Sequence, residues 1–331
     1  MTSPLAGHNV RRGAWLLLAV GAVIAFGVLF WPRSGPPSPA HPDQPVLSRS
    51  RHVRVMTFNI NMIEPTAGPH RWDIQQRILP QIIHKYQPDL IGFQACTPVQ
   101  TAWLADRFRQ FRHYPVSRGL AQGLFSAISG AIGTWNQIFY STRFRRLAGA
   151  HGLVRPGALR NNATENAYYS LVVLGDRSGV LPPIILLDTH LRHGNQNAVA
   201  DAGRLHGIVA SFIKRFPHSR VIVLGDMNHP RTDLPVYNQL LGPPSRINGG
   251  FRWSDTFNYN LKPAGVRWGT VQYYVGRPGL NWPSDLIFVG PGWKWSAAKI
   301  IRMHGPHGNY ASDHFPVFTV LTPGAAAAEG K

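Results

Sequence analysis

The segment Val221–Asn228, VIVLGDMN, decides the fold class of this chain. Four apolar residues, Val221 to Leu224, end at Gly225, and a short apolar run that ends at glycine predicts a buried β-strand. Asp226 and Asn228 follow two residues apart, so on an extended chain they face the same side. The segment therefore predicts a strand that presents an acid and an amide where it leaves the sheet, which is a usual place for binding residues in α/β proteins.

The flanking sequence predicts further strands and three helices. Apolar residues at helical spacing predict helices over 72–86, 99–111 and 198–216. Apolar or β-branched runs predict strands over 53–60, 89–93, 138–140, 170–174, 184–188, 286–289 and 317–321, with a turn or further strand at 144–147. Because helices separate only some of the strands, the pattern predicts an α/β sandwich with mixed sheets rather than a parallel Rossmann sheet. The sequence also contains neither common glycine-rich phosphate loop.

Composition excludes wholesale disorder and predicts a basic surface. The chain has 331 residues, of which 44% are hydrophobic and 15% charged, which is enough for a large core. Its formal net charge is +19, from 34 Lys+Arg against 15 Asp+Glu. Most of the basic residues are arginine, which favours anionic partners such as nucleic acid, phospholipid or phosphorylated metabolites, although a generally basic surface is the alternative. The single cysteine, Cys96, excludes an intramolecular disulfide and is predicted to be buried.

The N-terminal region predicts export of the rest of the chain. Residues 13–31 are nineteen residues without charge, long enough to cross a bilayer, and Arg11 and Arg12 precede them. The arginine pair predicts a cytoplasmic N-terminus over residues 1–12 and a single-pass signal anchor, so that the protein is held at the membrane with its C-terminal domain exported. The alternative is a cleaved signal peptide and a secreted protein. A proline-rich linker is expected over 32–52, a folded domain over 53–322 and a disordered tail over 323–331.

Several predicted strands end in polar residues suited to chemistry: Asn59, His190, Asp226, Asn228, Asp285, Asp313 and His314. Carboxylate and amide oxygens are ligands that Mg²⁺ prefers. A histidine beside an acid suits a general base or a phosphate contact. Each residue by itself is more often a turn, cap or hydrogen-bonding residue, so the prediction of one shared cleft depends on the whole set.

The order of short motifs along the chain resembles the endonuclease/exonuclease/phosphatase (DNase I-like) superfamily. These motifs are TFN, then QA after DLIGF, then THL, GDMN, SDLIFV and SDHFPV, and together they span about residues 53–321. The resemblance implies a four-layered α/β sandwich, in which two mixed β-sheets pack face to face with helices outside. It also implies a Mg²⁺-dependent hydrolase, with Mn²⁺ as an alternative ion, acting on a phosphodiester or phosphomonoester. We expect a monomer, and the substrate classes include nucleic acid and anionic lipid.

The resemblance assigns catalytic roles to particular residues. His314 would be the general base that activates water for attack on phosphorus, and Asp285 would orient and support it. Asp226 and Asn228 would position the nucleophile and the phosphate, and His190 would donate a hydrogen bond to a phosphate oxygen. These roles suit chemistry that depends on positioning and on electrostatic stabilisation.

The same resemblance assigns the metal to Asn59 and Asp313, but one expected ligand is replaced. The family has glutamate directly after the glutamine of its LQE-type motif, whereas here Gln94 is followed by Ala95. Alanine offers no oxygen, so binding of Mg²⁺ should be weakened. The family's further acid is also not evident around residues 135–137.

Three interpretations of this replacement remain open. Another acid, such as Glu64 just past the first strand, could complete the metal site. The protein could be a weak or altered enzyme. It could also be a catalytically impaired pseudoenzyme whose cleft binds anionic phosphate ligands.

Overall fold

A computed structural model of the chain describes residues 50–61, 72–115, 135–154, 167–192, 195–242, 252–257, 269–279 and 282–324. The chain divides into two units, Met1–Gln44 and Pro45–Lys331, and every described residue belongs to the second. The predicted membrane span at 13–31 therefore lies outside the described residues, as do most of the predicted linker and tail. None of the helices in the described ranges is long and apolar enough to cross a membrane.

The first sheet has seven strands in the order β11-β13-β1-β2-β4-β3, with β12 also paired to β13. Its strands are β1 (Val53–Asn59), β2 (Leu90–Cys96), β3 (Phe111–Tyr114), β4 (Trp135–Ser141), β11 (Trp293–Trp295), β12 (Lys299–Ile300) and β13 (Val317–Pro323). Strands β1 and β2 are parallel and the other pairs are antiparallel, so the sheet is mixed.

The second sheet has six strands in the order β5-β6-β7-β8-β10-β9. Its strands are β5 (Phe144–Leu153), β6 (Tyr168–Asp176), β7 (Ile184–His190), β8 (Arg220–Asp226), β9 (Ser254–Asp255) and β10 (Asp285–Val289). Strands β7 and β8 are parallel, and the remaining pairs are antiparallel.

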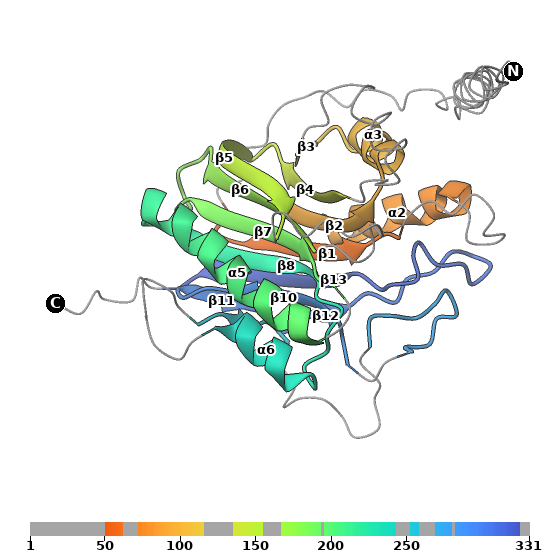
Figure 1. Ribbon diagram of the computed structural model, residues 1–331. Coiled ribbons are helices and arrows are strands. Elements are labelled where there is room, and N and C mark those ends of the chain that lie inside the picture. Colours follow the sequence, from red (N-terminus) through yellow and green to blue (C-terminus); the bar gives the residue numbers. More distant parts are fainter. Residues whose placement is uncertain are drawn as a thin grey trace, which may run out of the picture. The chain divides into compact units, whose positions relative to one another are not determined.

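The two sheets pack face to face, with helices on their outer faces (Figure 1). Helices α2 (Trp72–Tyr86) and α3 (Pro98–Arg107) share one apolar cluster with the outer side of the first sheet. Helices α5 (Asn195–Arg215) and α6 (Leu234–Leu241) cover the second sheet. The structure thus confirms the predicted four-layered α/β sandwich, and burial of apolar side chains between its layers supplies the main stabilisation.

Most predicted elements are present, with differences at their ends. Helix α2 has the predicted bounds, and the strand VIVLGD is β8. The helix predicted over 99–111 is too long, because α3 begins at Pro98 behind a capping box formed by Thr97 and Gln100 and ends at Arg107. Phe111 instead begins β3, which the sequence did not predict, and α6 was not predicted either.

Two parallel crossovers bring polar residues to one end of the sandwich. Strands β1 and β2 are joined through α2, and β7 and β8 through α5, so their carboxyl ends meet at the same end. Gly225 makes the close approach of β8 to β7 feasible, because its φ is 146° and a Cβ there would lie 1.8 Å from the carbonyl oxygen of Thr189. The residue before Asp226 must therefore lack a side chain.

The opposite end of the sandwich carries a buried arginine that fixes the start of β1. Arg143 lies in the turn between β4 and β5 and is 5% exposed. Its guanidinium donates to the carbonyl oxygens of Ser50 and of His52, the latter at 2.9 Å, and its Nε lies 3.3 Å from Asp176 Oδ1. Charge-assisted hydrogen bonds of this kind are stronger than neutral ones.

Candidate active site

Sheet register places three predicted site residues side by side. His190 at the end of β7 pairs with Asp226 at the end of β8, and Asp226 pairs with Asp285 at the start of β10. His190 Nε2 lies 3.6 Å from Asp226 Oδ2. His190 and Asp285 are 95 positions apart in the sequence. The pairing places them, with Asp226 between them, in one row at the strand ends of the second sheet.

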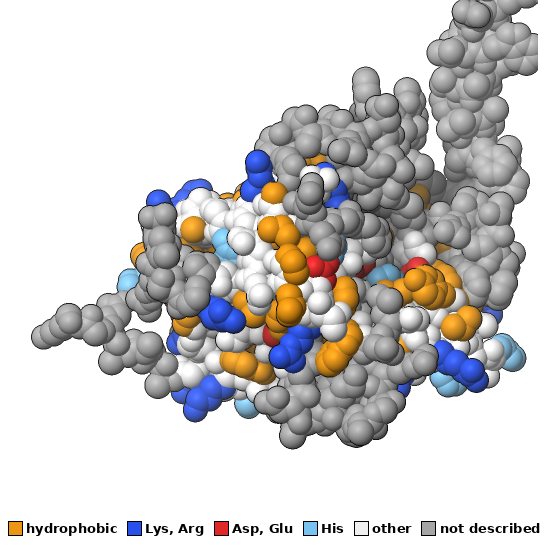
Figure 2. All heavy atoms as spheres, turned by 60° about the horizontal axis from the view of Figure 1, so that its bottom comes forward, with side chains coloured by type: hydrophobic (Ala, Val, Ile, Leu, Met, Phe, Trp, Pro, Cys, Tyr) orange, Lys and Arg blue, Asp and Glu red, His pale blue; other side chains and the backbone are white. Residues whose placement is uncertain are grey.

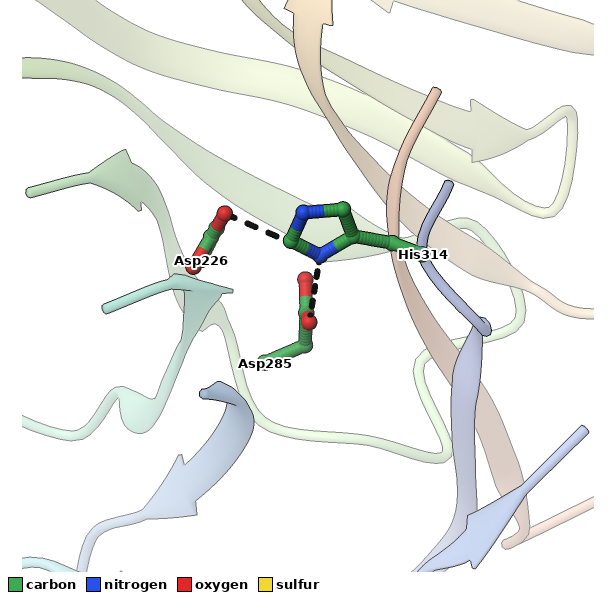
Figure 3. Close-up of side chains that lie close together, drawn as sticks. All are labelled: Asp226, Asp285 and His314. Atoms are coloured by element: carbon green, nitrogen blue, oxygen red, sulfur yellow. Dashed lines mark hydrogen bonds and ion pairs between the residues drawn. The ribbon is translucent and has the colours of Figure 1, made fainter. Parts of the chain in front are cut away.

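His314 lies against this row, and its side chain points toward both acids (Figure 3). Its Nδ1 is 2.9 Å from Asp285 Oδ2 and 3.8 Å from Asp226 Oδ2. The histidine side chain is 10% exposed, and those of the two acids are at most 1% exposed. Its backbone N–H donates to Ser312 Oγ at 3.2 Å, which fixes the segment just before β13. Because Asp285 occupies Nδ1, Nε2 is the nitrogen that can exchange a proton with water or substrate.

Burial and charge set the protonation of this group. Burial alone would lower the pKa of His314, but Asp285 and Asp226 outweigh it and raise the pKa to about 10. Burial would raise the pKa of Asp226, yet the charges of His314 and His190 hold it below its usual value. Burial raises the pKa of Asp285, despite the opposing charge of His314. In the form described here, His314 is therefore an imidazolium at neutral pH.

Both sheets hold the Asp226 carboxylate in place. Asn59, at the end of β1, donates from Nδ2 to Asp226 Oδ2 at 2.9 Å. The backbone N–H of Asn228 donates to Asp226 Oδ1, also at 2.9 Å. Asn228 has a φ of 52°, a left-handed conformation that asparagine tolerates, and its Nδ2 donates to the carbonyl oxygen of Leu191 at 2.7 Å. The predicted residues Asn59, Asp226 and Asn228 thus form one hydrogen-bonded group.

The predicted metal residues Asn59 and Asp313 meet at Ser312. Ser312 Oγ lies 2.7 Å from the carbonyl oxygen of Asn59 and 3.1 Å from Asp313 Oδ1. Asn59 Oδ1 already accepts from the backbone N–H of Asn61 at 2.9 Å and keeps one lone pair. Carboxylate and amide oxygens are the kinds of ligand that a divalent cation such as Mg²⁺ takes together with water and substrate phosphate.

Ala95 follows Gln94, which pairs with Asn59, and it has an unusual backbone conformation. It lies at a bulge of β2, between Phe93 and Cys96, with a φ of 51°. Its methyl group supplies no ligand, and Glu64, the suggested replacement, lies outside the described residues. A different set, Asp226, Asp285 and His314, offers donor atoms within 4.8 Å of one another and could hold a metal ion. Such an ion would have to displace the proton of His314, because metals bind the neutral imidazole.

Sequence reasoning missed a buried acid behind the site. Asp188, two residues before His190 on β7, is not among the site residues that the sequence predicts. Its Oδ1 lies 2.6 Å from Gln94 Nε2 across the gap between the sheets, and it is fully buried. Burial raises its pKa well above the ordinary value, although the hydrogen bond from Gln94 opposes this. Gly92 makes room for it, since a Cβ there would lie 2.9 Å from the Asp188 carboxyl group.

Solved structures share this fold over most of their length. A mannosyl-6-phosphatase of Bacteroides thetaiotaomicron superposes with a TM-score of 0.64 at 16% identity, covering 82% of this chain and 99% of that chain. TDP2 of D. rerio, in complex with a single-strand DNA product, superposes with a TM-score of 0.60 at 16% identity over 82% and 100% of the two chains. The catalytic domain of human Nocturnin, with bound sulfate, gives 0.58 at 18% identity over 82% and 95%.

Sequence comparison identifies the family directly. No curated protein matches the sequence. A family model described as the Endonuclease/Exonuclease/phosphatase family matches residues 56–314, a range that contains every described site residue. Since this range covers most of the 331 residues, the chain belongs to the Endonuclease/Exonuclease/phosphatase family.

Proposed function

We propose that the protein is an exported, membrane-anchored hydrolase of phosphoesters. The observation that carries the proposal is the buried hydrogen bond of 2.9 Å between His314 and Asp285, set beside Asp226 and His190 in one row of the second sheet. A buried histidine with a carboxylate on one nitrogen and an accessible second nitrogen is suited to proton transfer. The family includes phosphatases and nucleases, which supports hydrolysis of a phosphoester.

In the proposed reaction, neutral His314 accepts a proton at Nε2 from a water molecule that attacks phosphorus. The bond from phosphorus to the leaving oxygen breaks, and that oxygen takes up a proton from solvent and leaves as an alcohol. His314 then releases its proton to solvent. Asp285 holds the resulting imidazolium in place. His190 donates to a phosphate oxygen, and Asp226 with Asn228 positions the water and the phosphate.

The pKa of His314 predicts how the rate depends on pH. With a pKa of about 10, roughly one histidine in a thousand is neutral at pH 7. The value of kcat/KM, which reports protonation in the free enzyme, should therefore rise with pH toward about pH 10, and a bound cation should move this rise to lower pH. A rate that is flat across this range would argue against His314 as the base.

Mg²⁺ is the proposed cofactor, with Mn²⁺ as a substitute. The family generally depends on a divalent metal, and Asn59 and Asp313 would hold it here. When bound, the cation would neutralise charge on the phosphate and favour neutral His314 by repulsion. Because Ala95 offers no ligand, we expect weaker binding than with a carboxylate at that position.

Location and assembly are part of the proposal. Residues 13–31 would anchor the chain in the membrane, with the domain exported and acting as a monomer. Separation of membrane and soluble fractions, before and after carbonate extraction, distinguishes an anchor from a cleaved signal peptide. Recovery of the protein in the medium would overturn the anchor and favour the secreted alternative.

Hydrolysis is tested with purified full-length protein and millimolar Mg²⁺. The substrates are bis(p-nitrophenyl) phosphate, p-nitrophenyl phosphate, DNA, RNA, sphingomyelin and inositol phosphates. His314→Ala should lower the rate at least about 100-fold, the usual contribution of a general base. His218→Ala, an exposed histidine beyond the end of α5, should have no effect. Equal inactivity of wild type and His314→Ala on all six substrates would refute the hydrolase.

A second function is favoured by one specific observation. Ala95, which follows the Gln94 that pairs with Asn59, carries a methyl group where the family has a carboxylate. It is consistent with a protein that binds anionic phosphate ligands at the cell surface without cleaving them. Ala95→Glu discriminates between the two functions, with Mn²⁺ affinity measured by calorimetry and activity measured in parallel. A large gain in both would support an impaired site, whereas unchanged activity in an already active enzyme would support a substitute ligand.

A further inference from the structure

The segment 270–279 is attached directly to the backbone around His314. Val271 forms an isolated β-bridge with His314. The backbone N–H groups of Gln272 and Tyr273 both donate to the carbonyl oxygen of Asp313, at 2.7 and 3.1 Å. Because the Tyr273 N–H donates to the carbonyl oxygen of Asp313, the residue before His314, Tyr273 begins next to the histidine backbone.

Two consecutive tyrosines in this segment have left-handed backbone conformations. The φ angles are 48° for Tyr273 and 61° for Tyr274. Such conformations are unfavourable for bulky residues and persist only where the surroundings impose them. The Tyr274 hydroxyl supplies one constraint, because it lies 3.0 Å from Gln75 Nε2 on α2 and 3.4 Å from Asn61 Nδ2 just after β1.

The Tyr273 side chain lies at the surface and packs near Gly279. Tyr273 is 62% exposed, yet a Cβ on Gly279 would lie 2.6 Å from its Cε2 atom. One side of the ring therefore packs close to Gly279, while most of the side chain is exposed. Val275 is 66% exposed and Arg277 is also exposed in the same segment. On the face drawn in Figure 2, hydrophobic side chains gather beside acidic and histidine side chains.

We propose that Tyr273 is a specificity residue that stacks on a planar aromatic group of the phosphoester, such as the base of a nucleotide. This inference rests on the proposed function, since the phosphate must lie at His314. An exposed aromatic ring that packs near Gly279 on one side is suited to stacking on a flat partner. Arg277 adds positive charge four residues further along, as expected beside a partner that carries phosphate. Packing near Gly279 restricts the ring before the substrate binds, which lowers the entropic cost of binding.

The test compares a thymidine dinucleotide with the same sugar–phosphate lacking both bases. Binding is measured by calorimetry with the full-length protein carrying His314→Gln, which prevents turnover. The base-bearing ligand should bind about tenfold more tightly, a typical effect for one stacked base. Tyr273→Ala should reduce this preference to less than twofold, and Tyr273→Phe should retain it. Trp295→Ala, a half-exposed aromatic on β11 at the far end of β13, is the matched control and should retain it.

Other ligands identify the source of the base and the competing partner. A single-stranded oligonucleotide that binds more tightly than the dinucleotide supports a polymer as the source of the base. Equal affinity of the two ligands supports a free nucleotide. Equal binding of the thymidine dinucleotide and of the sugar–phosphate without bases would overturn the proposal. An unchanged preference of Tyr273→Ala for the ligand with bases would also overturn it. So would a Tyr273→Ala defect seen only on phosphatidylserine-containing vesicles, which would indicate a membrane contact. If binding depends on the bases but no substrate is hydrolysed, the inference about Tyr273 stands and the proposed hydrolase fails. If substrates are hydrolysed but the bases do not affect binding, the proposed hydrolase stands and the inference about Tyr273 fails.

Discussion

The proton held by His314 should make the stability of the folded protein depend on pH. The pKa of His314 is raised from 6.5 to about 10 in the folded state. Between these values the folded protein binds a proton that the unfolded chain has released. Its contribution to stability is therefore fully present below pH 6.5 and is lost as the pH rises toward 10.

The informative variant replaces both members of the pair, His314→Gln with Asp285→Asn. Replacing the histidine alone would remove its charge from Asp285 and Asp226. The pKa of Asp285, which burial already raises, would then rise further, so this acid would take up a proton in place of the histidine and the pH dependence would persist. Two neutral amides remove the titrating pair and keep similar shapes. The double variant should therefore lack the alkaline loss of stability.

The magnitude follows from linkage. One extra proton in the folded state changes the free energy of unfolding by about 1.4 kcal/mol per pH unit. Between pH 7.5 and 9.5 the wild type should lose about 3 kcal/mol relative to the double variant. A shift of this size exceeds the error of a denaturant titration and is a large part of the stability of a typical domain.

Urea unfolding at five pH values from 7.5 to 9.5 measures this difference. Buffers of constant ionic strength keep the screening of the charges unchanged. The exposed-residue variant His218→Gln serves as a control and should follow the wild type. If the wild type and the double variant lose stability in parallel, His314 is not protonated in the folded state and the reasoning about its pKa is wrong.

Three further substitutions test features around the site. Gly225→Ala should destabilise the fold by roughly 4 kcal/mol or more in urea unfolding, because its Cβ would lie 1.8 Å from Thr189 O; Gly179→Ala, with positive φ but open space, should lose only about 1 kcal/mol. Asp188→Asn should stay within about 1 kcal/mol of the wild type, because burial raises the pKa of this acid well above its ordinary value and so favours the protonated form that the amide resembles. Asp188→Ala should lose about 3 kcal/mol, and equal losses for the two variants would contradict this reasoning. Ala95→Gly should raise the free energy of unfolding by up to about 1 kcal/mol, seen as a higher urea midpoint, because glycine relieves the φ of 51°. A lower midpoint would show that no strain is stored at this residue.

Periodicity predicted the fold where segments were long and regular. Helix α2 was predicted with its bounds because isoleucines at helical spacing mark one face and Pro88 follows its end. Strand β3 was missed because its four residues, FRHY, follow a helix without a turn signal. Helix α6 was missed although Asp233 and Pro235 at its start are helix-start signals, because only eight residues follow them.

The site was predictable as a set of residues but not as an arrangement. Short motifs identified Asp226, Asp285 and His314, but the distances between them depend on the β8–β10 register, which arises from tertiary pairing. Asp188 has no such signal, since its burial depends on Gly92 in the other sheet. The left-handed tyrosines were equally invisible, because backbone conformations imposed by distant contacts leave no local pattern.

The hydrogen bonds of Arg143 have a mechanical consequence. They fasten the chain at Ser50 and His52 to the turn that connects β4 of one sheet with β5 of the other, and to Asp176 at the end of β6. A pull on the preceding segment is therefore shared between both sheets and does not peel β1 from its neighbours one hydrogen bond at a time. Asn59 lies at the far end of that strand, about 20 Å along it. We therefore expect Arg143 to spread force applied at the start of β1 over both sheets before it reaches the end of the strand that carries Asn59.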